Sequence, residues 1–306
     1  MSGAILDPIS LRLAVADALA FSGRLGRDFQ RHGFAVISDH TLDAAHVQAA
    51  LADAKTFFAL PDEIKRRYRV VGAAGQRGYT PFGLETAKGA SNADLKEFWH
   101  VGREGSGSGL ANIWPSEAPR FRASTVWLYD ALESLGAVIL GGIARHLGLS
   151  PSHFEPAIEG GDSILRLLHY PAVHFDGAAV RAGAHEDINA ITLLLGAEEA
   201  GLEILDREDG WRAINPPRGC IVVNIGDMLS RLTNNMLPST THRVVNPRGR
   251  RRATARYSMP FFLHFRADFS IRTLPGCITA DRPDRFPHPI TAGDFLKSRL
   301  AEIRLS

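Results

Sequence analysis

From about residue 160 onward, the chain consists of short β-branched and aliphatic runs that turn-forming residues separate. The strand-like runs are 164–170, 191–195, 202–205, 220–225, 241–245 and 253–259. The turn signals between them are Gly201, Asp209-Gly210, Pro216-Pro217, Gly226-Asp227, Pro247 and Gly249. Parallel strands need a helical crossover, and we expect no helices between these runs. The pattern therefore predicts an all-β core, folded as an antiparallel barrel or jelly roll.

The first 160 residues show helical periodicity instead. Apolar residues recur at steps of three and four over 42–60 and 120–149, which predicts two long helices. The run 33–38 predicts a strand, and the glycine-rich stretch 71–112 predicts loops. We expect one domain over 1–306, with a mainly helical N-terminal wrap (1–160), a jelly-roll core (161–270) and a C-terminal extension (271–306).

Charge and composition exclude several classes of partner. Lys and Arg total 35 against 33 Asp and Glu, and a formal charge of +2 indicates neither nucleic acid nor an anionic membrane. The basic cluster 248–252 is interpreted as a solvated hairpin tip. No apolar run approaches the roughly 18 residues of a spanning helix, and no signal segment is visible. Two cysteines, Cys220 and Cys277, exclude a disulfide scaffold and predict a cytoplasmic location.

Two His-x-Asp triplets are candidates for metal binding, because side chains two apart on a strand point the same way. His185 and Asp187 lead directly into the apolar run 191–195, which predicts a position at a barrel mouth. His174 and Asp176 lie in a turn-like stretch that we expect to be exposed. We therefore choose His185 and Asp187 as the ligand pair.

His242 is the best candidate for a third ligand. It lies in a later strand-like run, which an antiparallel barrel can place opposite the first pair. Two histidines and one carboxylate form the facial triad of non-haem Fe(II) oxygenases, although zinc hydrolases use the same ligand types. The triad by itself leaves the metal open.

A carboxylate clamp is expected on the next strand. Arg256 and Ser258 share one face of the run that follows His242 by fourteen residues. A guanidinium and a hydroxyl together bind a carboxylate through charge-assisted hydrogen bonds. Arg77 and Lys96 indicate an anionic substrate, such as a carboxylate-bearing metabolite. We interpret His146, His174 and His264 as ordinary histidines and not as metal ligands, since a lone histidine usually forms hydrogen bonds within the protein.

Further motifs follow one another along nearly the whole chain. They are 33–40, Arg77-Gly-Tyr79 with Glu85, 94–98, 165–171, 184–187 with 192–194, 201–204, 224–227 with 233–235, 239–244 and 256–262. In this order they resemble the isopenicillin N synthase-like branch of the iron(II)/2-oxoglutarate-dependent oxygenases.

The resemblance implies a double-stranded β-helix with iron held by His185, Asp187 and His242. It implies that 2-oxoglutarate chelates the iron and reaches Arg256 and Ser258, joined by Tyr170, with its far carboxylate. The family consumes O2, releases succinate and CO2, and hydroxylates or desaturates a small molecule.

Two alternatives remain at this stage. Leu168 stands where many 2-oxoglutarate users carry asparagine, and the Arg-x-Ser pair also occurs in branch members that bind another carboxylate. An iron oxidase of the isopenicillin N synthase type, which uses no 2-oxoglutarate, is therefore the second hypothesis. A non-catalytic jelly roll that binds a small ligand is the third.

Overall fold

Two antiparallel sheets pack face to face in the computed structural model, which describes residues 6–73, 75–84, 94–105, 110–172, 181–196, 201–206, 210–246 and 254–302. The large sheet has the order β1 (Ile9–Ser10), β2 (Phe34–Ser38), β10 (Ile221–Ile225), β7 (Ile191–Leu195), β12 (Arg256–Leu263), β5 (Ile164–Tyr170), β4 (Glu97–Gly102) and β3 (Gly78–Thr80). The small sheet has the order β6 (Ala182–His185), β11 (His242–Val244), β8 (Leu202–Asp206) and β9 (Gly210–Ala213). Only the short β1–β2 pair is parallel among these described strands.

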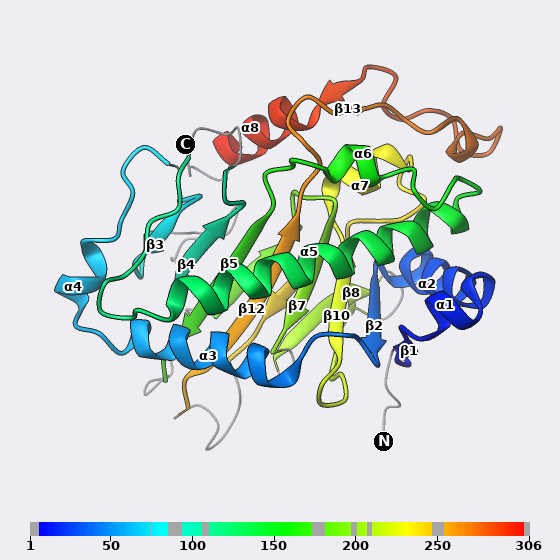
Figure 1. Ribbon diagram of the computed structural model, residues 1–306. Helices are drawn as coiled ribbons and strands as arrows, with labels where there is room; N and C mark the ends of the chain where they lie inside the picture. Colours follow the sequence, from blue (N-terminus) through cyan, green and yellow to red (C-terminus); the bar gives the residue numbers. More distant parts are fainter. Residues whose placement is uncertain are drawn as a thin grey trace.

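Helices cover the outer face of the large sheet. Figure 1 shows α5 (Phe121–His146) and α3 (Ala44–Phe58) crossing this face, with α2 (Ala18–His32) beside β2. Apolar residues of α5 at helical spacing are buried, and Gly136 allows close approach to β12, since a Cβ there would lie 2.4 Å from Leu263 Cδ1. α5 is long and apolar enough to cross a membrane, but half of its apolar window is buried in this packing.

Shorter elements complete the chain. They are α1 (Leu13–Ala16), α4 (Asp62–Arg66), α6 (Glu155–Ile158), α7 (Asp227–Leu232), the 3-10 turn η2 (Pro275–Cys277), the strand pair β13 (Ser270–Ile271) and β14 (Ile290–Thr291), and the C-terminal helix α8 (Ala292–Glu302). A salt bridge of 2.9 Å between Arg299 and Asp227 fastens α8 to the start of α7.

The alternation of side chains along each central strand separates two environments. On β12, Met259, Phe261 and Leu263 join the core under the helices, whereas Arg256 and Ser258 face the space between the sheets. At the β2–β10 end this space is filled by an apolar cluster made of Leu6, Phe34, Val36, Leu202, Ile204, Ile214, Cys220 and Val222. Toward β5 and β12 the interior becomes polar, and the candidate site lies there.

The predicted long helices and the predicted strands of the core are confirmed within a few residues. The picture of a mainly helical N-terminal wrap was incomplete, because β1 to β4 all join the large sheet. β4 was not predicted from the sequence, because its residues are buried on both faces and polar and apolar residues therefore do not alternate. The stretch predicted as loops also contains β3. The clusters 248–252 and 174–176 lie outside the described residues.

Candidate active site

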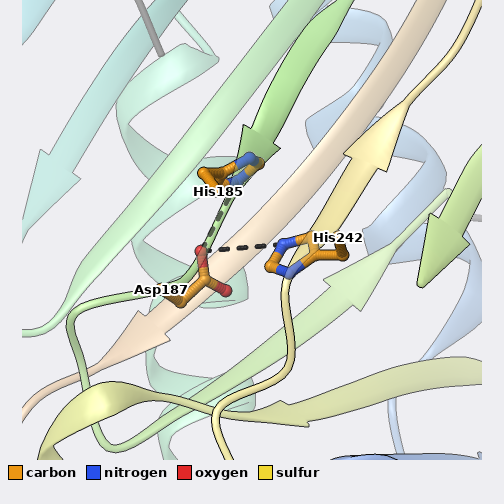
Figure 2. A group of neighbouring side chains, drawn as sticks. All are labelled: His185, Asp187 and His242. Atoms are coloured by element: carbon orange, nitrogen blue, oxygen red, sulfur yellow. Dashed lines mark ion pairs between the residues drawn. The ribbon is translucent and has the colours of Figure 1, made fainter. Parts of the chain in front are cut away.

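The two sheets bring His185, Asp187 and His242 together, as the sequence predicted. His185 ends β6, Asp187 follows two residues later, and His242 begins β11 directly opposite His185. His185 Nε2 lies 3.8 Å from Asp187 Oδ1, and His242 Nε2 lies 3.9 Å from the same oxygen (Figure 2). Three ligand atoms within 4.8 Å of one another match the donor set of a facial triad.

Backbone carbonyls orient both imidazoles. Nδ1 of His185 donates to Gly183 O at 2.8 Å, and Nδ1 of His242 donates to Thr240 O at 3.1 Å. With Nδ1 carrying the proton, Nε2 is left as a bare nitrogen toward Asp187, which is the form that binds a metal. Desolvation, followed by the neighbouring His242, lowers the pKa of His185 to about 4 and keeps this ring neutral.

Asp187 is held by two side-chain hydrogen bonds to one of its oxygens. Oδ2 accepts from Thr192 Oγ1 at 2.5 Å and from Asn224 Nδ2 at 2.8 Å. Burial alone would raise the pKa of Asp187, but the hydrogen bonds from Asn224 and Thr192 help to lower it overall. The carboxylate is therefore ionised, and Oδ1 faces the two imidazoles, where it can bind a cation.

Arg256 and Ser258 line the same cavity as the triad. Arg256 is 1% exposed, pairs in register with Tyr170 of β5, and holds its Cζ 5.5 Å from the Tyr170 ring centre. Its Nε and Nη1 have no hydrogen-bond partner among the described residues. A buried guanidinium without an anion is strongly unfavourable, so this pocket fits a carboxylate brought by a ligand. The donor set therefore fits both a divalent metal and an oxo acid.

Two family models match the chain. The 2OG-Fe(II) oxygenase superfamily model matches residues 161–265, and the model described as non-haem dioxygenase in morphine synthesis N-terminal matches residues 6–117. The chain is 33% identical over 283 residues to the 2-oxoglutarate-Fe(II) type oxidoreductase hxnY of Emericella nidulans, covering 87% of this chain and 80% of the relative. The chain belongs to the 2OG-Fe(II) oxygenase superfamily.

Other relatives of this oxygenase agree. Proline hydroxylase buaE of Petromyces alliaceus is 35% identical, with 92% of this chain and 93% of that protein covered. A 2OG-Fe(II) oxygenase family protein of Caulobacter crescentus has 54% identity and a TM-score of 0.92, with coverages of 98% and 99%. A full-length Neurospora crassa protein, solved in complex with alpha-KG, has 28% identity and a TM-score of 0.89, with coverages of 98% and 97%.

These findings confirm the predicted branch, the double-stranded β-helix fold and the dependence on iron and 2-oxoglutarate. The protein is a 2-oxoglutarate/Fe(II)-dependent dioxygenase. This finding favours the 2-oxoglutarate-dependent oxygenase over the iron oxidase and over the non-catalytic jelly roll.

A second cavity of the oxygenase, of about 140 Å³, adjoins the triad and shares Arg166, His185, Asp187 and Phe262 with the first. The rest of its wall comes from several elements: Gln76, His100, Ile164, Glu186, Ile188, Asn189, His264, Leu296 and Leu300. α8 therefore closes one side of the space next to the proposed ligands. This cavity is independent of Arg256, Ser258 and Tyr170, which line the first cavity only.

Sequence reasoning missed or misplaced several residues around the site. Thr192 and Asn224 were part of the motifs, but nothing in their spacing marked them as partners of Asp187. Arg77 is buried but lines neither cavity, and Lys96 lines the first cavity paired to Asp94 at 2.7 Å. Neither residue lines the second cavity.

Proposed function

We propose that His185, Asp187 and His242 hold the Fe(II) of this oxygenase. The support is the convergence of two bare imidazole nitrogens on Asp187 Oδ1, while Thr192 and Asn224 bind the other oxygen. Three protein ligands leave open positions for the cosubstrate and O2. The two hydrogen bonds keep the carboxylate oriented, and the Gly183 and Thr240 carbonyls keep the rings oriented.

Arg256, Ser258 and Tyr170 are proposed to bind the far carboxylate of 2-oxoglutarate. The observation that carries this assignment is the buried Arg256 guanidinium, whose Nε and Nη1 lack partners among the described residues. Two charge-assisted hydrogen bonds to a carboxylate would satisfy them, and the Ser258 hydroxyl on the same face would add a third. Leu168, which pairs with Ser258 across the strands, forms an apolar part of this wall.

The second cavity is proposed to receive a small primary substrate, which is hydroxylated or desaturated. Bound iron and 2-oxoglutarate supply the oxidising chemistry, with O2 consumed and succinate and CO2 released. The protein positions the substrate C–H bond beside the triad, and Phe262, Leu296 and Leu300 exclude water from that position. We also propose a cytoplasmic location, supported by two cysteines that are buried as thiols.

An anaerobic titration tests the cofactor assignments. Apo-protein is titrated with Fe(II) and then 2-oxoglutarate, the visible charge-transfer band of the chelated oxo acid is followed, and succinate is assayed after O2 is admitted. We expect a saturable band and then succinate. Iron binding without a band would instead support the oxidase, with the substrate's own carboxylate at Arg256.

A further inference from the structure

His264 lies in the second cavity, where the alternation of β12 carries its side chain. Arg256, Ser258 and Phe262 face the interior between the sheets, and His264 follows Phe262 by two residues. It is 6% exposed and contributes to the same wall as Phe262. His264 is buried, as expected of a core histidine, and its side chain also lines a cavity.

The backbone around His264 is fixed from both sides. The His264 N–H donates to Ser163 Oγ at 3.1 Å, and the preceding carbonyl, of Leu263, accepts from Ala190 N–H at 2.9 Å. Leu263 itself packs against Gly136 of α5. The His264 imidazole therefore reaches the cavity from a rigid backbone at the end of β12. A fixed position of this kind suits a side chain that distinguishes between ligands.

The His264 ring has an unused hydrogen-bonding capacity. Nδ1 is buried and has no partner among the described residues, whereas the backbone N–H of His264 donates to Ser163 Oγ. Leaving such a group unpaired is unfavourable, so a buried polar atom of this kind calls for an explanation. Burial lowers the pKa of His264 to about 4, so that the ring is neutral at pH 7 and offers one donor and one acceptor.

Several other polar groups of this wall already have partners. Arg166 Nε donates to His100 Nε2 at 2.5 Å, and the Arg166 guanidinium lies 4.2 Å from the Phe98 ring centre. Asn189 Nδ2 donates to Ile191 O at 2.7 Å, and Glu186 Oε1 accepts from Thr241 Oγ1 at 2.9 Å. Nδ1 of His264 is the one side-chain nitrogen or oxygen of this wall that is buried without a partner among the described residues, which makes His264 the group suited to recognition.

We infer that His264 determines substrate specificity by hydrogen bonding to a neutral polar group, such as an amide or hydroxyl, on a substrate about the size of one ring. The size follows from the cavity, since an engineered apolar cavity of about 150 Å³ accommodates benzene. Ile164, Phe262, Leu296 and Leu300 supply the apolar surface for the rest of such a molecule. This inference rests on the proposed function, because it assumes that the second cavity is the substrate site.

Anaerobic calorimetry on the protein loaded with Fe(II) and 2-oxoglutarate tests the inference with three ring probes. They are 2-pyridone, which is neutral with a donor and an acceptor, benzoate, which is anionic, and toluene, which is apolar. Wild-type protein should bind 2-pyridone at least about ten-fold more tightly than the other two. His264→Leu should weaken 2-pyridone about ten-fold and leave toluene unchanged, while His264→Gln should recover part of the loss.

His153→Ala is the matched control, because His153 is an exposed histidine outside both cavities. Equal 2-pyridone affinity in wild type and His264→Leu would overturn the inference, and so would a preference for benzoate or no binding of 2-pyridone. The charge-transfer band is recorded on every sample. Its absence from wild type would refute the proposed function, whereas a normal band with a His264-independent ring affinity refutes the inference alone.

Discussion

Two buried polar clusters lie on opposite faces of the large sheet, and they differ in how fully their groups are paired. On the outer face, Glu97 Oε2 accepts from Lys65 Nζ at 2.8 Å and from the Tyr79 hydroxyl, and Glu97 Oε1 pairs with His169 Nδ1 at 2.7 Å. On the inner face, Arg256 and His264 carry nitrogens without partners among the described residues.

The difference separates a structural cluster from a binding site. Burial alone would raise the pKa of Glu97, but the hydrogen bonds from His169, Lys65 and Tyr79 lower it overall. The folded protein therefore provides the hydrogen-bond partners that this buried carboxylate needs. The inner groups would be satisfied only by a ligand. Substitutions on the outer face should therefore affect stability, and those on the inner face should affect ligand binding.

The largest effect is expected for His242→Ala. Loss of one of three proposed ligands should abolish both Fe(II) binding and succinate formation, as measured by the anaerobic titration. Asp176→Ala, in the second His-x-Asp triplet, should retain iron. Turnover by His242→Ala, or loss of iron from Asp176→Ala, would show that the ligand set is misassigned.

Glu97→Gln should destabilise the protein by about 3 kcal/mol, because it breaks a buried ion pair while leaving Lys65 buried. Chemical denaturation measures this, and the 2-oxoglutarate affinity should remain within about two-fold. The folded-state pKa of Glu97 is below its ordinary value of 4.5, so its contribution is present above that value and is lost as the pH falls toward the folded-state pKa. The stability gap between wild type and variant should therefore shrink in acid, and a constant gap would contradict this role.

Arg256→Met should show the opposite behaviour. The 2-oxoglutarate affinity should fall about 100-fold, or about 2.7 kcal/mol, since two charge-assisted hydrogen bonds are lost. Stability without ligand should be unchanged or increased, because a buried charge is replaced by an apolar side chain. Titration of the charge-transfer band and denaturation measure the two quantities. Arg266→Met is the control, since Arg266 is exposed and paired with Asp268; a normal 2-oxoglutarate affinity in Arg256→Met would refute the clamp.

The smallest effect is expected for Thr192→Val, which removes one hydrogen bond from Asp187 Oδ2 and keeps the side-chain shape. Fe(II) affinity should fall about ten-fold, as is usual when a residue that orients a metal ligand is lost. Thr273→Val is a matched control, because it removes a partly buried threonine–aspartate hydrogen bond, 2.8 Å to Asp284 Oδ1, outside both cavities. Equal iron affinities in the two variants would contradict the orienting role.

Much of the fold was predictable because it depends on local patterns. The strand runs, the helix over α5 and the shared face of Arg256 and Ser258 all follow from residue spacing along one element. The same spacing placed His185 beside Asp187. Burial on both faces hid β4, and β6 and β9 are short four-residue strands that the run pattern did not show.

The sequence by itself determined which side chains share a face and which residue types could bind a metal and a carboxylate. Only the tertiary structure decided what each face meets. Period-two alternation places His169 and Tyr170 on opposite faces, but it does not say that one face meets Lys65 of α4 and the other an open cavity. Asn224 reaches Asp187 across 37 positions of chain. Whether a buried polar group is paired depends on such distant partners. For that reason the proposed role of His264 could be inferred only from the tertiary structure.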